Sequence, residues 1–313
     1  MPSNICDEVL PSLLDVTLSV YHSIHQRRGP ESPSTVQQHI VGLHSMSELI
    51  SSIVWIQKKV SVQTSVELVE LWVHEMQRIF RDGFATQADT AWYDGVVERA
   101  MASHISGTLI GEQPNQAVYT DMLDSDTFTR YDDMANLEAE LTSKLQSSRP
   151  DYIVCRDVTL GLFRTYRLLT QGKNCLMLGE QFGRRDICKI SAHLAGYEVQ
   201  STELSDWNRS STFWRSHIKT WVRAAALDKK KLVVFASCSN GLDERFMLEL
   251  CALTSGALPE LFFTASEWQE CMSQLRNADR LAPGENTEAC FRRRVQENLR
   301  VVLGCPEVRA NCL

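Results

Sequence analysis

The stretch CLMLGEQFGRRDICKISAHLAG, residues 175–196, decides the fold of the second half of the chain. An apolar run over 175–178 ends at Gly179, and a second glycine, Gly183, precedes apolar residues at helical spacing over 184–195. A strand, a glycine loop and a helix in this order is the context in which proteins cradle phosphate. The stretch therefore predicts a nucleotide site, the remains of one, or an ordinary strand-to-helix turn.

The loop differs from a working P-loop, G-x-x-x-x-G-K-[ST], in length and in side chains. It is one residue shorter, and Arg184, Arg185 and Asp186 follow the second glycine. Arginine does not place its charge as a compact lysine ammonium does, and a carboxylate repels phosphate where a hydroxyl would hold Mg²⁺. We interpret Gly179, Gly183, Arg184 and Arg185 as a vestigial P-loop. No cofactor is expected there, with retained ATP or ADP as the alternative.

The segment KLVVFASCSNGLDE, residues 231–244, is an independent check. A P-loop ATPase ends this buried strand with an aspartate for the metal and often a glutamate that activates water, but Ser237 and Cys238 stand here. The next carboxylates, Asp243 and Glu244, fall at the start of a helix, where the helix dipole favours them. We therefore expect no catalytic residue and no bound metal.

Cys238 leaves a second enzyme class open. It follows a strand at the carboxyl end, where active sites of α/β proteins occur. A cysteine-dependent α/β enzyme is therefore a further alternative, although the sequence identifies no charged partner that would lower the pKa of this thiol.

The order of apolar patterns predicts an α/β protein with a helical N-terminal region. Apolar spacing predicts that residues 1–105 are helical. One helix covers 8–27 and another covers 65–84. Between them, a helix capped by Ser34 or Thr35 carries an apolar face formed by Leu43, Met46, Leu49, Ile50 and Ile53. Residues 106–130 are polar and irregular, and helices follow near 132–145 and 158–169. Strands at 174–178, 198–203, 232–236 and 300–304 alternate with helices near 184–195, 209–226, 243–254 and 287–298. Such alternation predicts a parallel sheet with flanking helices. We divide the chain into 1–105, 106–173 and 174–313.

Composition excludes several classes of function. The formal net charge is −7, so a broad nucleic-acid surface is not expected. No apolar run is long enough for a membrane span, and the first residues lack a secretory signal. The 10 cysteines show no C-x-x-C spacing, and Cys175, Cys251 and Cys305 lie in apolar runs, so we expect reduced, buried thiols.

Two other groups of polar residues are interpreted as ordinary surface. His22 and His25 could share a helix face, but no third metal ligand is evident. The basic clusters Lys229–Lys231 and Arg292–Arg294 with Arg300 are expected to be solvated.

Five segments together resemble the dynein heavy chain family. LVELWVHEMQRIFRD (68–82) resembles the L-W-x-H-E-x-x-R-V-F-x-D-R helix in the lid of the third AAA+ module, and QHIVGLHSMS (38–47) resembles H-Y-x-F-N-L-R-D-x-S of the same lid. The 175–196 stretch, GALPELF (256–262) and FRRRVQENLRVVL (291–303) resemble the core of the fourth module. His44 and Gly83 stand where the family has arginines, which puts nucleotide sensing by this lid in doubt.

The resemblance implies a lid of a preceding module (1–105), a linker with helices (106–173), and an incomplete, degenerate AAA+ P-loop core (174–313). The chain is similar to the divergent dynein heavy chain domain-containing relatives associated with sperm flagella. We expect this chain to be a fragment or a truncated product. The implied function is a non-catalytic structural segment of a motor ring for microtubule-based movement, inside a parent ATPase. The alternative is a regulatory module that holds ATP or ADP without hydrolysis.

The resemblance also implies partners and a location. The partners are other AAA+ modules of the same heavy chain, and intermediate and light chains through the parent protein. The location is the cytoplasmic cytoskeleton, in the axoneme of a cilium or sperm flagellum. We expect this segment not to bind microtubules directly, because it has no long heptad pattern for a stalk.

The same lid helices carry an apolar stripe, Leu71, Trp72, Ile79 and Phe80, that needs burial. We expect part of it to pack within the lid helices and the remaining lid surface to meet the flank of the 174–304 sheet. Neither Trp72 nor His74 should cap the Gly179 loop. Arg184 or Arg185 should be free to reach the phosphate region.

Overall fold

The computed structural model describes residues 3–27, 42–59, 62–84, 86–109, 118–123, 128–131, 133–146, 153–178, 183–203, 211–237, 244–255, 259–279 and 286–305. They belong to two compact units, one within Met1–Arg156 and one within Asp157–Val308. Each unit has its own hydrophobic core.

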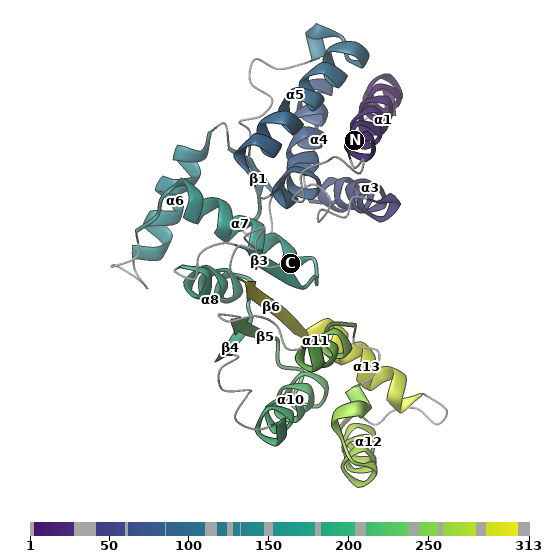
Figure 1. The fold of residues 1–313 in the computed structure, drawn as a ribbon, viewed down its shortest axis with the longest axis vertical. Coiled ribbons are helices and arrows are strands. Elements are labelled where there is room, and N and C mark those ends of the chain that lie inside the picture. Colours follow the sequence, from purple (N-terminus) through teal and green to yellow (C-terminus); the bar gives the residue numbers. More distant parts are fainter. Residues whose placement is uncertain are drawn as a thin grey trace. The chain divides into compact units, whose positions relative to one another are not determined.

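The first unit is mainly helical (Figure 1). Its elements are α1 (Ser3–Gln26), α3 (Leu43–Gln57), α4 (Ser65–Ile79), α5 (Gln87–His104), α6 (Met134–Gln146), strands β1 (Val118–Thr120) and β2 (Thr129–Tyr131), and 3-10 turns at Arg81–Gly83 and Gly107–Leu109. The predicted helices are therefore present. Ser34 and Thr35 lie outside the described residues, and α3 begins after Gly42.

Helix α4 is the centre of this unit. Thr64 caps it by accepting a hydrogen bond from the Glu67 backbone N–H. Leu71, Trp72 and Phe80 are buried in the core with Ile79 packed against it, and the Trp72 Nε1 donates to Thr17 Oγ1 on α1 at 3.1 Å. The expectation that the apolar stripe packs within the lid helices is confirmed.

Two details of the first unit differ from the sequence-based expectation. The apolar face assigned to α3 is only partly buried, since Leu43 and Ile50 are exposed while Leu49 is inside. The polar composition of 106–130 predicted irregular structure, but β1 and the first residues of β2 lie in this range and pair as an antiparallel hairpin. The hairpin is held to α4 by Arg130, whose guanidinium bonds the Glu70 carboxylate at 2.9 and 3.1 Å.

The second unit is an α/β sheet with helices on both faces (Figure 1). Its elements are α7 (Arg156–Thr170), β3 (Cys175–Leu178), α8 (Arg184–Leu194), β4 (Glu198–Glu203), α10 (Ser211–Ala226), β5 (Leu232–Ser237), α11 (Glu244–Ser255), a 3-10 turn at Pro259–Phe262, α12 (Ala265–Asp279), α13 (Thr287–Asn298) and β6 (Leu299–Cys305). The described sheet is parallel throughout, in the order β3-β6-β5-β4. The predicted parallel sheet is confirmed; α12 was not predicted.

Alternate residues of the central strands point into two separate cores, as the two-residue repeat of a strand requires. Val233, Phe235 and Val302 pack with Leu169 of α7 and with α8. Val234 and Val301 pack on the opposite side with α10, α11, α12 and α13. Because both faces are covered, β5 is apolar at nearly every position.

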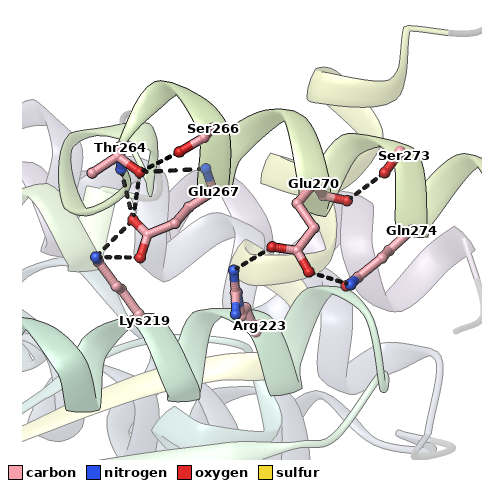
Figure 2. A network of polar contacts seen from close by, with 8 residues as sticks. All are labelled: Lys219, Arg223, Thr264, Ser266, Glu267, Glu270, Ser273 and Gln274. Atoms are coloured by element: carbon pink, nitrogen blue, oxygen red, sulfur yellow. Dashed lines mark hydrogen bonds and ion pairs between the residues drawn. The ribbon is translucent and has the colours of Figure 1, made fainter.

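Helix α10 is joined to its neighbours by three cations spaced four residues apart. Arg215 pairs with Glu249 of α11, and Lys219 and Arg223 pair with Glu267 and Glu270 of α12. Figure 2 shows the α12 part, in which Glu267 also accepts from the Thr264 backbone N–H at 2.8 Å. The N-terminal cap of α12 and its attachment to α10 therefore use the same carboxylate.

Arg300 is not solvated, contrary to the interpretation of the basic clusters. It is buried, and its guanidinium donates to the backbone oxygens of Gln296, Leu299 and Glu297 at the end of α13. The last carbonyls of a helix have no partner within the helix, so a cation there satisfies them. The charge of Arg300 is used inside the fold.

Candidate nucleotide-binding site

Parallel pairing brings the carboxyl ends of the strands to one edge of the sheet. Met177 lies opposite Gly304, Leu178 opposite Cys305, and Gly304 also lies opposite Ser237. Ligands of open α/β sheets bind at this edge. Strand β3, which precedes the candidate P-loop residues in the chain, ends at this edge.

Gly183 forms the start of α8. Its φ is +88° and its ψ is −29°, a left-handed conformation that glycine adopts without strain. The Ile187 backbone N–H donates to the Gly183 oxygen at 2.8 Å, which opens the helix. A Cβ on Gly183 would meet nothing within 4 Å, so backbone conformation, and not space, favours glycine here. Gly179 lies outside the described residues.

The two arginines after Gly183 point in different directions. Arg185 is exposed, whereas Arg184 is 6% exposed. The Arg184 Nη1 donates to the Met177 oxygen at 3.4 Å, at the end of β3. We expected either Arg184 or Arg185 to be free, and of the two the exposed residue is Arg185, whereas Arg184 is turned inward.

Among the described residues, the ends of β3, β5 and β6 carry no acidic side chain, whereas β4, at the edge of the sheet, ends at Glu203. Leu178 ends β3, Gly304 and Cys305 end β6, and the half-buried Ser237 ends β5. A Cβ on Gly304 would lie 3.1 Å from the Phe235 ring, so the ring packs against a bare backbone. Cys238 lies outside the described residues, and α11 begins at Glu244, as predicted for that helix.

Two thiols lie where α8 packs on the sheet, the half-buried Cys175 of β3 and the buried Cys188 of α8. Burial raises the pKa of Cys175 to about 12, partly opposed by a hydrogen bond with the Thr165 side chain. Burial also raises the pKa of Cys188 to about 12. Such thiols are poor nucleophiles at neutral pH. Cys305 is buried as expected, but Cys251 is exposed, so its prediction as a buried thiol was wrong.

The H-E-x-x-R part of the helix at 68–82 forms a buried polar network in the first unit. The Glu75 carboxylate accepts from Ser52 Oγ and, at 3.0 Å, from Arg78 Nε. Its other oxygen lies 3.2 Å from His74 Nδ1, and Arg78 also lies 3.5 Å from Glu48. Arg78 therefore links the buried Glu75 carboxylate to Glu48, which is a structural role and not an exposed binding site.

The described residues contain no group of three or more histidine, cysteine, aspartate or glutamate side chains arranged to hold a metal ion. Within the same part of the chain, no helix combines the length and apolar character needed to cross a membrane. His25 of α1 instead lies against Tyr21, with ring centroids 4.4 Å apart.

Comparison with known proteins adds an independent observation. Residues 151–312 match a family described as the P-loop containing dynein motor region D4. The chain is 25% identical over 309 residues to dynein axonemal heavy chain 1 of Homo sapiens, covering 93% of this chain and 7% of that protein. It is 26% identical over 323 residues to the dynein-1-beta heavy chain of the flagellar inner arm I1 complex of Chlamydomonas reinhardtii, covering 95% and 7%. The chain thus spans about 7% of the length of these relatives.

Proposed function

This chain belongs to the dynein heavy chain family, and from that premise we propose that it is a non-catalytic structural segment of a dynein motor ring. In this proposal it contributes to microtubule-based movement only as part of a longer heavy chain, whose other modules hydrolyse ATP. The names of its relatives, which are axonemal and flagellar heavy chains, support a location in the axoneme of a cilium or flagellum.

The absence of acidic side chains at the described ends of β3, β5 and β6 carries the proposal. ATP hydrolysis in this fold needs a carboxylate for Mg²⁺ and a group that positions the attacking water. Loss of both should lower the rate by many orders of magnitude. The Asp186 carboxylate in the first turn of α8 adds repulsion where phosphates would lie.

The experiment is phosphate release by the purified chain with Mg-ATP, compared with a Gly183→Asp variant. We expect both proteins to give the rate of the buffer alone, because both lack the carboxylate for Mg²⁺ and the group that positions the attacking water. A steady rate in the unaltered chain that Gly183→Asp abolishes would contradict the proposal. A Cys238→Glu variant should also stay inactive, because one carboxylate does not restore the phosphate and metal ligands.

A regulatory module that binds ATP or ADP without hydrolysis is the second candidate. The observation that favours it is the retained left-handed Gly183 at the start of α8, since helix N-termini after such glycines bind anions. Saturable binding of Mg-ADP in equilibrium dialysis, with no phosphate release, would favour this candidate over the first.

The partners in this proposal follow from the family. They are neighbouring AAA+ modules of the same heavy chain, with intermediate and light chains joined through the parent protein. The expectation that the lid surface meets the flank of the sheet concerns the placement of the two units and stays a prediction.

A further inference from the structure

Arg184 stands at the first position of α8 with its charge directed into the protein. Its side chain is buried, and its Nη1 lies within hydrogen-bonding distance of the Met177 oxygen. Arg185, the next residue on the same helix, is exposed. The two neighbouring arginines therefore have different environments, and of the two it is Arg184 that contacts the sheet.

Gly304 provides the room for this arrangement. A Cβ on Gly304 would lie 3.7 Å from the Arg184 Nη1 and 3.1 Å from the Phe235 ring. Glycine inside a strand often marks a close approach by another group. Here the guanidinium and the aromatic ring both pack near the same bare backbone, at the ends of β5 and β6.

We propose that the Arg184 side chain has a structural role as an internal brace, or plug. It holds α8 against the ends of β3 and β6, and its guanidinium is therefore not available to bind a phosphate group. This inference rests on the proposed function and deepens it, because it assigns a structural role to an arginine that follows the P-loop glycine and could otherwise have met phosphate. A guanidinium that left this position would give up the Met177 carbonyl and open a gap beside Phe235 and Gly304. Asp186 supplies the negative charge that the N-terminus of α8 favours.

The first test compares matched substitutions in the complete chain, Arg184→Met and Arg185→Met. Arg184→Met should lower the midpoint of thermal unfolding by about 3–6 °C, because the hydrogen bond from a charged group to the part-buried Met177 carbonyl is lost together with the packing of the buried side chain. Arg185→Met should leave the midpoint unchanged. Arg184→Lys, which keeps the charge but not the fork of donors, should give an intermediate value and serves if Arg184→Met does not fold. Equal midpoints for all variants would overturn the brace.

The second test uses the unaltered chain and an arginine-specific dicarbonyl reagent, with modified peptides quantified by mass spectrometry. Arg184 should react at least about tenfold more slowly than Arg185, because it is accessible only when the local structure opens. Equal rates would show that Arg184 spends much of its time outside, and would overturn the plug.

Millimolar Mg-ADP and Mg-ATPγS complete the design. Neither should raise the unfolding midpoint of the unaltered chain, because a ligand that does not bind the native state does not stabilise it. Stabilisation that disappears in Arg184→Met would make Arg184 a phosphate ligand and overturn the inference, while non-catalytic function would stand. Phosphate release from Mg-ATP would instead overturn the proposed function, whatever the position of Arg184.

Discussion

Gly172 ends α7 in the left-handed region, with φ of +74°, and it lies against the buried Arg300. A Cβ at this position would lie 2.8 Å from the Arg300 Nη2, closer than real Cβ contacts. Gly183 has a similar φ of +88°, but a Cβ there would meet nothing within 4 Å. A side chain at Gly183 would therefore meet only backbone strain, whereas a side chain at Gly172 would meet backbone strain and a steric conflict.

We predict that Gly172→Ala destabilises the chain more than Gly183→Ala. An alanine in the left-handed region costs about 1–2 kcal/mol, which both variants should lose. Gly172→Ala should lose more, because Arg300 must also move from the carbonyls at the end of α13. The measurement is urea unfolding with hydrogen exchange at the amides of β3 and β6. Equal losses would contradict the role given to Arg300.

The cysteines make a second prediction at the residue scale. Cys155 and Cys251 are exposed, whereas Cys175 is half-buried and Cys188 is buried, both with pKa values raised to about 12. At pH 8 we expect iodoacetamide to modify the exposed pair and to leave Cys175 and Cys188 intact in the native chain. The control is the same reaction in denaturant, where the thiols should all react. Rapid native modification of Cys188 would contradict the packing of α8.

At the scale of elements, α12 shows how a helix is attached by charge as well as by apolar contact. Trp268 packs edge-on against Phe291 of α13 at 5.1 Å, and Cys271 and Leu275 are fully buried. Lys219 of α10 reaches the Glu267 carboxylate at 2.7 and 2.8 Å. The Arg223–Glu270 pair next to it is longer, at 3.7 Å.

We predict that the Lys219–Glu267 pair stabilises α12 at neutral pH and not in acid. The hydrogen bond from Lys219, with those from Thr264, lowers the pKa of Glu267 from its ordinary 4.5 to about 2. Because the folded state has the lower pKa, the stabilisation is complete above about pH 4.5 and disappears as the pH falls through 2. Glu267→Gln should therefore lower the unfolding midpoint at pH 7, and the difference from the unaltered chain should shrink below pH 4.5.

Glu270→Gln is the matched control for this prediction, since it removes the longer and more exposed pair on the same helix. It should change the midpoint less at pH 7, as exposed ion pairs contribute little. A loss in Glu267→Gln that stays constant down to pH 3 would mean that packing of the side chain, and not its charge, is responsible.

The strands of the parallel sheet were predictable because strands that are buried on both faces consist of consecutive apolar residues. Leu232 to Phe235 is a continuous apolar run, which a strand covered on both faces requires, and the strand predicted at 232–236 matches β5 within one residue. Helix α12 carries a readable signal as well, since Trp268, Cys271 and Leu275 recur at helical spacing. The three-residue strands β1 and β2 are too short to show a repeat.

The direction of Arg184 and the burial of Arg300 could not be predicted in the same way. Both depend on contacts between segments far apart in the sequence, such as Gly304 with Arg184 and Gly172 with Arg300. In the sequence, each arginine stands in a basic cluster of the kind that is usually solvated. Only the fold shows that their charges satisfy backbone oxygens.

At the scale of the whole molecule, the basic clusters bear on what the chain can bind. Arg292 lies 3.9 Å from Glu288 and Arg293 lies 4.0 Å from Glu297, each one turn away on α13. The Arg294 Nη1 donates to the Ala226 oxygen at 3.2 Å. With a formal net charge of −7, the chain does not offer a broad cationic surface to an acidic polymer.

We therefore predict that the chain does not bind microtubules by itself. No long heptad repeat for a stalk occurs in the sequence, and the Arg292–Arg294 cluster is partly neutralised within α13. The measurement is co-sedimentation with stabilised microtubules at physiological ionic strength, where exposed charges act over about 8 Å. A weak association that disappears with added salt, and equally in a Lys229→Glu, Lys230→Glu variant, would be nonspecific attraction to the acidic lattice. Saturable binding that survives added salt would contradict the prediction, and would mean that this segment contacts the track directly as well as forming part of the ring.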